Sequence, residues 1–206
     1  MKKLSNNNVK LNSLIVSLVF AISLLFFKPV LAFDDVLHNE ESKVGFSEPI
    51  SDDMLIDSLP EKELNLYDIH TKKSLKIVFW KNGAYIEDAL LELNEFLRDR
   101  RNKAVTRMDP ELFMLIHRIY EEVKGTKPIH VISAYRSKKS NDSMRSSGRK
   151  VAKKSQHIEG KAMDIRIPGV PLKKLRDTAL KMGVGGVGFY RASNFVHIDT
   201  GRPRTW

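Results

Sequence analysis

The sequence predicts an α+β fold: a single domain with an antiparallel sheet flanked by helices. Two segments with helical spacing of apolar residues lie in the first half of the domain predicted at 64–206, at 85–100 and 110–125. Short apolar or alternating segments typical of strands dominate from residue 129 onward. Helices and strands separated along the chain in this way favour α+β over α/β architecture, in which they alternate. No internal repeat is present, and the length suits one core.

The first half predicts one strand and two helices. Leu75–Trp80 is rich in β-branched and aromatic residues, and the Asn82-Gly83 turn after it begins a hairpin or leads into a helix. Asp109 and Pro110 have the residue types of an N-cap and a first helical position. The apolar residues expected to face the core are Ile86, Ala89, Leu90, Leu93, Phe96 and Leu97 in the helix at 85–100, and Leu112, Leu115, Ile116, Ile119 and Val123 in the helix that stops at Gly125.

The second half predicts four strands and one helix. The glycine-rich segment Gly183–Gly188 is interpreted as tight turns beside a strand, because it lacks the strand-to-helix context and acidic partner of a nucleotide-binding motif. The expected elements are strand Ile129–Tyr135, strand Lys161–Pro168, helix Pro171–Met182, strand Val187–Tyr190 and strand Phe195–Thr200.

The N-terminal segment, residues 1–32, is typical of a secretory signal peptide. A lysine-containing start precedes a largely apolar segment of 14 residues, Leu14–Phe27, and Ala32 is the expected cleavage site. An uncleaved anchor is the alternative, but 14 residues are short for a span that needs about 20. We therefore expect Sec-type export to the periplasm or cell envelope without stable membrane insertion. Residues 33–63 are acidic and weakly periodic, which predicts a flexible leader before the domain at 64–206.

Composition narrows the kinds of site and partner. The chain has no cysteine, which excludes disulfides and thiolate metal ligands. Its formal net charge of +10 falls to +6 once the four lysines of the predicted signal are set aside, and the segment Ser137–Gln156 alone carries seven Lys or Arg and one Asp. This basic segment is either a solvated mobile loop or a cover that attracts anionic substrates. Nucleic acid is not an expected partner, because the chain is exported and the segment lacks interleaved aromatic residues.

Two imidazoles and a carboxylate are spaced so that they can share a metal ion. Alternation places Asp164 on the polar face of one predicted strand and His197 on the polar face of another, with Asp199 on the same face as His197. Gly160 lets the backbone turn, so that His157 can approach from a loop. Three protein ligands leave a tetrahedral Zn²⁺ one position for water, whose pKa then falls towards about 7. The pattern predicts a hydrolase with one zinc ion.

The same residues carry a resemblance to a known group. The chain resembles the zinc peptidases of the hedgehog/D-alanyl-D-alanine peptidase superfamily, and within it the murein endopeptidase K-like enzymes, over about residues 64–206. Further similarity lies in Ser133–Ser137, Gly185–Tyr190 and Phe195–Trp206. The residues that match the pattern S-x-H-x-x-G-x-A-x-D with a later histidine are Ser155, His157, Gly160, Ala162, Asp164 and His197.

The resemblance implies a periplasmic enzyme that hydrolyses peptide cross-links of peptidoglycan, with those between two diaminopimelate residues favoured. We expect a monomer. The resemblance also implies zinc on His157, Asp164 and His197. Arg136 corresponds to an arginine of the group that polarises the scissile carbonyl or binds a substrate carboxylate. Tyr135 and Gln156 are expected to add hydrogen bonds to substrate.

The chain departs from the group's pattern at one position. Many relatives have a glutamate as general base three residues before the last histidine, where this chain has Asn194. Asp199 is therefore the candidate proton acceptor, and a role limited to orienting His197 is the alternative. The remaining histidines considered, His70, His117 and His130, are interpreted as structural.

Two other functions remain open from the sequence. One is a carboxypeptidase or dipeptidase that trims terminal D-alanine. The other is a catalytically inactive, zinc-stabilised module that binds the cell wall, which is motivated by Asn194 in place of the usual base. The ligand set would also accept divalent transition metals other than zinc.

Overall fold

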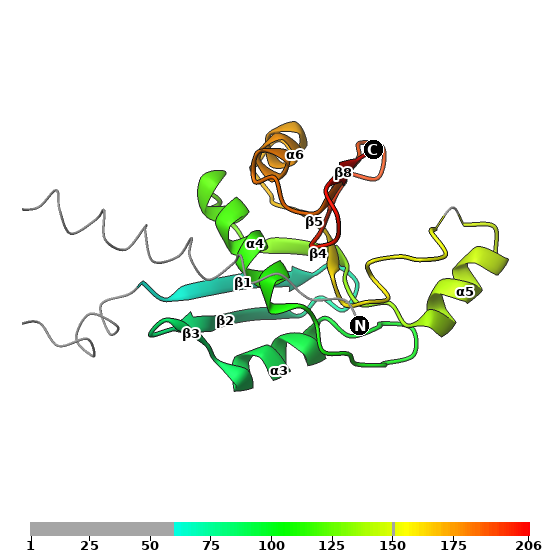
Figure 1. The fold of residues 1–206 in the computed structure, drawn as a ribbon, viewed down its shortest axis with the longest axis horizontal. Coiled ribbons are helices and arrows are strands. Elements are labelled where there is room, and N and C mark those ends of the chain that lie inside the picture. Colours follow the sequence, from blue (N-terminus) through cyan, green and yellow to red (C-terminus); the bar gives the residue numbers. More distant parts are fainter. Residues whose placement is uncertain (1–59, 150) are drawn as a thin grey trace, which may run out of the picture. The chain divides into compact units, whose positions relative to one another are not determined.

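An eight-stranded mixed sheet with four helices forms the part of the protein that the structure, a computed structural model, describes: residues 60–149 and 151–206 (Figure 1). These residues belong to one compact unit, Ser47–Trp206. The strand order is β3-β2-β1-β4-β5-β7-β6-β8. The elements are β1 (Lys62–Asp68), β2 (Ser74–Lys81), β3 (Ala84–Tyr85), α3 (Glu87–Phe96), α4 (Pro110–Glu122), β4 (Ile129–Ser133), α5 (Lys138–Ser146), β5 (Ala162–Arg166), α6 (Leu172–Lys181), β6 (Gly186–Tyr190), β7 (Phe195–Asp199) and β8 (Arg204–Thr205).

The N-terminal strands form an antiparallel hairpin that the sequence predicted only in part. β2 matches the expected strand at 75–80, and it pairs with β3 through the predicted turn. β1 was not predicted, although Leu64 and Leu66 alternate and are both buried in the core. The predicted helix at 85–100 is shorter than expected, because Tyr85 belongs to β3 and the chain turns away after Phe96.

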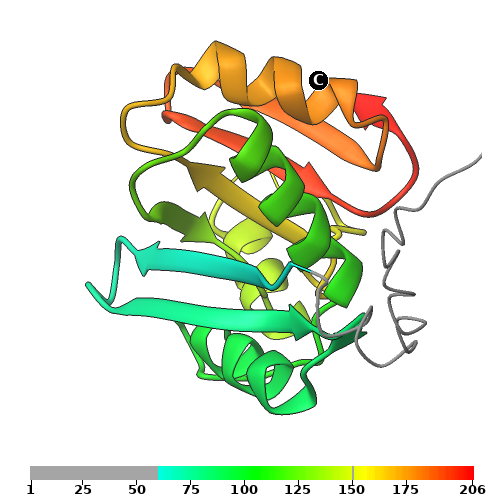
Figure 2. The same cartoon turned by 90° about the vertical axis from the view of Figure 1, so that its left-hand side faces the viewer.

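The core lies between the sheet and helices α4 and α6, which cover the same face and contact each other (Figure 2). The Asp109 side chain caps α4 by accepting a hydrogen bond from the backbone N–H of Glu111, which confirms the predicted N-cap. Phe79 of β2 packs edge-on against Phe113 of α4, with ring centroids 6.3 Å apart. All the apolar residues predicted to point inward from α4 are buried: Leu112, Leu115, Ile116, Ile119 and Val123.

The expectation of an antiparallel sheet is wrong at two of the seven strand pairs. β1 and β4 are parallel, and so are β6 and β8. The chain between β1 and β4 contains β2, β3, α3 and α4, which is long enough to return it to the same end of the sheet. Along the chain, β7 comes between β6 and β8 and runs antiparallel to β6. The chain reverses once more after β7, so β8 runs in the same direction as β6.

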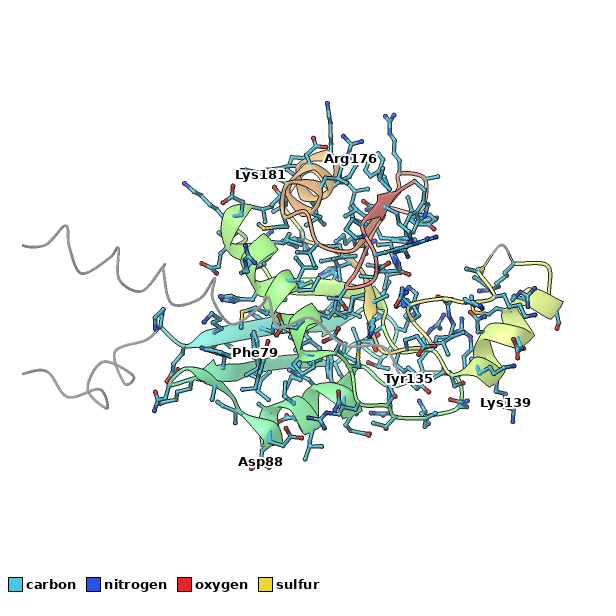
Figure 3. The ribbon with its side chains drawn as sticks, viewed as in Figure 1. Phe79, Asp88, Tyr135, Lys139, Arg176 and Lys181 are labelled. Atoms are coloured by element: carbon cyan, nitrogen blue, oxygen red, sulfur yellow. The ribbon has the colours of Figure 1, made fainter. Side chains whose placement is uncertain are left out.

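Helix α5 is the second element that the sequence did not predict. It occupies the first half of the basic segment, and its N-cap Ser137 accepts a hydrogen bond from the backbone N–H of Ser140. In Figure 1 the helix projects away from the sheet, and in Figure 2 it is seen behind the strands, on the face opposite α4 and α6. Lys139 points outward from it in Figure 3.

The predicted signal peptide, 1–32, lies outside the described residues, as does the predicted leader up to residue 59. The first described strand begins at Lys62, close to the expected start of the domain. Within residues 60–149 and 151–206, the helices are all too short or too polar to cross a membrane.

Candidate metal centre

Asp164 and His197 lie directly opposite each other on paired strands. β5 and β7 are antiparallel, with Asp164 in register with His197. Met163 and Ile165, the neighbours of Asp164 in β5, are buried in the core on the side of α4, so alternation turns the Asp164 carboxylate to the opposite face. Its Oδ1 lies 2.9 Å from His197 Nδ1. The predicted pleat geometry for these two residues is confirmed.

His157 joins this pair from the loop before β5. Its Nε2 lies 3.3 Å from Asp164 Oδ1, and one ligand atom from each of the three residues falls within 4.8 Å of the others. Gly160 makes this approach possible, because it has a φ of +67°, and a Cβ there would lie 3.0 Å from the Arg107 carbonyl oxygen. The three side chains therefore converge from two strands and a loop, as the sequence predicted.

Each imidazole uses its other nitrogen for a hydrogen bond that fixes the ring. His157 Nδ1 lies 2.7 Å from the Ala134 carbonyl oxygen, and a carbonyl can only accept, so Nδ1 carries the proton and Nε2 is free to bind an ion. On the other ring, His197 Nε2 lies 2.8 Å from Asp199 Oδ2, which leaves Nδ1 facing Asp164. Hydrogen bonds of this kind are typical of histidines that bind metals.

Asp199 is buried and fully engaged behind His197. Its Oδ2 accepts from His197 Nε2 and, at 2.6 Å, from Arg204 Nη2. Its Oδ1 accepts from the backbone N–H groups of Gly186 and Gly201 at 2.9 and 2.8 Å and from Arg204 Nη1 at 3.1 Å. Burial alone would raise the pKa of Asp199, but these donors outweigh burial and hold that pKa below its ordinary value. The carboxylate is therefore ionised and turned away from the open site.

Close packing around Asp199 explains part of the glycine-rich segment. A Cβ on Gly186 would lie 2.5 Å from Arg204 Nη1 and 2.6 Å from Asp199 Oδ2. Gly185, with a φ of +64°, passes so close to the Asp199 carbonyl that no side chain fits there. These glycines provide turns, as expected, and they also make room for the Arg204–Asp199 pair.

The three side chains fit a divalent transition metal. Burial would raise the pKa of Asp164, yet its electrostatic interactions with the adjacent His157 and His197 rings hold that pKa below its ordinary value, so the carboxylate is available as an anionic ligand. Two imidazole nitrogens and one carboxylate oxygen form a donor set known from catalytic metal sites with three protein ligands. Among residues 60–149 and 151–206, no other group of three histidine or carboxylate side chains is gathered closely enough to hold a metal ion.

A cleft of about 420 Å³ opens over these residues. Gln156 and Arg136, which the sequence analysis expects to bind substrate, line it. Tyr135, which is labelled in Figure 3, does not: it packs against the core and lines an adjoining small pocket near the end of α3, which shares His70 and Arg100 with the cleft. His70, which the sequence did not suggest as a site residue, lines the cleft, and its Nε2 lies 3.0 Å from the Ile132 carbonyl oxygen.

Arg136 is buried beside the metal centre with part of its donor capacity unused. Only 7% of the residue is exposed. Nη2 donates to Ser155 Oγ at 3.2 Å and Nη1 contacts Met144 Sδ at 3.6 Å, whereas Nε is buried and has no hydrogen-bond partner among the described residues. A buried, unpaired N–H is costly in a folded protein and is commonly satisfied by a ligand.

An asparagine at position 194 suits the turn in which this residue lies. It lies between β6 and β7, is exposed, and has a left-handed φ of +54°, a conformation that asparagine tolerates better than most residues. Its backbone N–H donates to the Arg191 carbonyl, which closes the turn.

Aromatic residues to which the sequence analysis gave no role in the site line one part of the cleft. Tyr190 and Phe195, paired across β6 and β7, stack with ring centroids 4.5 Å apart. Trp206 donates from Nε1 to Tyr190 Oη, and its ring lies 5.1 Å from the His197 ring. The strand pairing could have indicated the first contact, but only the fold brings Trp206 to the site.

Comparison with known proteins identifies relatives of this chain. Residues 57–206 match the family described as peptidoglycan L,D-endopeptidase MepK. The peptidoglycan L,D-endopeptidase MepK of Escherichia coli strain K12 is 45% identical over 143 residues, which cover 69% of this chain and 79% of the relative. The probable peptidoglycan L,D-endopeptidase MepK of Haemophilus influenzae is 41% identical over 144 residues, or 69% and 77% of the two chains. A search of solved structures found no match. With its buried His-Asp-His group and this similarity over most of its length, the chain belongs to the MepK family of metallopeptidases.

Proposed function

We propose that this protein hydrolyses peptide cross-links of peptidoglycan as a zinc-dependent L,D-endopeptidase, with bonds between two diaminopimelate residues as substrate. The observation that carries the proposal is the buried group of His157, Asp164 and His197 at an open cleft. Membership of the MepK family supports the substrate class. We assign the domain to the hedgehog/D-alanyl-D-alanine peptidase fold.

His157 Nε2, Asp164 Oδ1 and His197 Nδ1 would hold one zinc ion. Bound there, zinc supplies Lewis-acid activation of water and of the scissile carbonyl. Arg136 is suited to bind the amide oxygen or a neighbouring carboxylate, because its Nε–H lacks a partner and its guanidinium is charged and buried beside Asp164. Gln156 lines the same cleft and can orient the peptide through its amide.

For Asp199 we propose the orienting role. A general base must reach the proton that it accepts, and both Asp199 oxygens are already occupied by donors on the far side of His197. As an orienting group, Asp199 holds the proton on His197 Nε2 and keeps Nδ1 free for the metal.

The remaining proposals concern the location and oligomeric state of the protein. The signal-like segment at 1–32 and the leader at 33–63 favour export to the periplasm, where peptidoglycan is accessible, and we expect a monomer without membrane insertion after the signal is removed.

One experiment separates this proposal from its alternatives. Full-length mature protein is incubated with cross-linked muropeptide dimers, with and without chelator, and its metal content is measured on the same preparation. Monomeric products that require metal support the endopeptidase. Loss of one D-alanine per molecule would instead indicate a carboxypeptidase, and binding without any product would indicate an inactive module.

The site itself is tested by substitution. His157→Ala should abolish turnover and bound metal, while the matched variant His117→Ala, on α4, should keep both. His117 packs near Phe79 and its Nδ1 lies 3.1 Å from the Glu63 carbonyl oxygen, so it is remote from the cleft. Turnover that survives in His157→Ala would show that the site is elsewhere.

A further inference from the structure

The cleft over the metal centre is strongly cationic. Six Lys or Arg residues line it, and Asp164 is the only carboxylate among its lining residues. Arg204 pairs with Asp199, and Arg136 is buried beside Asp164. The other four have no ion-pair partner in the part of the chain that the structure describes: Arg100, Arg101, Arg149 and Lys154.

Arg100 and Arg101 are carried on a turn with a fixed backbone. Asp99, which is completely buried, accepts from the Arg101 backbone N–H at 2.9 Å and from the Ser137 N–H and Oγ at 2.9 and 2.7 Å. Hydrogen bonds between Asp99 and residues 103–104, at 2.7 and 2.9 Å, close the turn. The two arginines therefore extend from a rigid segment that is tied to the start of α5, and less entropy is lost when they bind a ligand.

These cations repel one another. Partial burial lowers the pKa of Arg101, and the charges of Arg100 and Arg149 lower it further. The charge of Arg101 in turn contributes to the lowered pKa of Arg136, for which burial is again the main cause. Like charges gathered from separate segments around one opening are unfavourable without a counter-ion, and an anionic ligand would relieve the repulsion.

The proposed substrate carries an anion at a defined place. When the side-chain amine of a diaminopimelate residue is acylated in a cross-link, the carbon that bears the scissile nitrogen also bears a carboxylate, which stays free unless it is amidated. This anion lies two bonds from the atom that leaves in hydrolysis, so any group that binds it also positions the scissile amide.

We propose that Arg100 and Arg101 form a specificity subsite that binds this free carboxylate and makes the enzyme discriminate against amidated cross-links. The inference rests on the proposed function and assigns a role to two residues that the metal chemistry does not require. A planar guanidinium matches a carboxylate through paired hydrogen bonds, whereas a primary amide offers one acceptor and no charge.

The test uses a synthetic cross-linked stem-peptide dimer in two forms, with that carboxylate free or as a primary amide. Binding by calorimetry and turnover are measured for full-length mature wild type and for the double variant Arg100→Gln/Arg101→Gln. The control is Lys103→Gln, which removes a charge from the same turn but lies outside the cleft. Melting temperatures of all variants establish that they are folded.

We expect the double variant to lose about ten- to thirtyfold in affinity and kcat/KM for the free acid, the lower part of the range of a charge-assisted hydrogen bond, and less than about twofold for the amide. The control should match wild type on both forms. If the double variant lost the same affinity and kcat/KM for both forms of the substrate, or lost none, the proposed carboxylate subsite would be refuted. If wild type binds the free acid selectively through these arginines but cleaves neither form, the subsite stands and the proposed endopeptidase function fails.

Discussion

The substitution Asp199→Asn separates the two roles considered for this residue. It keeps the size and shape of the side chain but replaces one acceptor oxygen by an NH₂ donor. Five N–H donors converge on the two Asp199 oxygens: one from His197, two from Arg204 and the backbone groups of Gly186 and Gly201. Whichever way the amide is turned, its NH₂ meets at least two of these donors.

The least costly arrangement places the NH₂ where Oδ2 was, facing Arg204 and His197. Leaving the Arg204 N–H unpaired there costs about 1–3 kcal/mol. His197 can relieve its own conflict only by moving its proton to Nδ1, the nitrogen that faces Asp164 and would bind the metal. We therefore expect metal affinity to fall about 10- to 100-fold, the usual effect of losing such a partner.

Metal affinity is measured by competition with a chromophoric chelator, alongside the melting temperature and turnover at saturating metal. Asp177→Asn is the matched control, because Asp177 forms only an exposed ion pair with Arg176 on α6. A variant that binds metal as tightly as wild type but has lost turnover would refute the orienting role and restore Asp199 as a proton acceptor.

Three further outcomes are expected. Arg204→Lys should lower the unfolding free energy by about 1–2 kcal/mol in urea titrations, because an ammonium cannot reproduce the paired contacts with both Asp199 oxygens. Gly186→Ala should cost about 1–3 kcal/mol and weaken metal binding, measured by the same chelator competition, since the added methyl displaces Arg204 or Asp199. Phe113→Ala should cost about 3–5 kcal/mol in stability, while metal bound per folded molecule stays unchanged, because Phe113 lies in the core on the other face of the sheet.

The metal centre was predictable because it depends on local geometry. Two-residue alternation fixes which side chains of a strand share a face. It therefore predicted that Asp164 and His197 lie on the polar faces of their strands, and the pairing of β5 with β7 places them opposite each other. Gly160 indicated the turn that brings in His157. The helix α4 was predictable for the same reason, since its cap and its apolar stripe are properties of one continuous segment.

The elements that were missed depend on contacts between distant segments. β1 carries charged and polar residues around Leu64 and Leu66, and it is held as a strand by β2 on one side and β4 on the other. Helix α5 has almost no apolar residues of its own, and its start is fixed by Asp99, 38 residues away from Ser137. Neither partner can be inferred from the segment itself, because hydrophobic periodicity indicates which side chains share a face but not which distant segment the element contacts.

The parallel pairing of β6 and β8, which was not expected, has a direct bearing on the metal centre. β8 pairs through Gly186 and Val187, and this register places Arg204 opposite Gly186. A side chain at Gly186 would fill the space in which Arg204 meets Asp199, so the pairing and the glycine are both needed for that contact. Through Asp199, the contact fixes the proton on His197 and thereby the nitrogen offered to the metal. The two-residue strand β8 is therefore part of the site, and changes that weaken its pairing should reduce metal affinity before they unfold the domain.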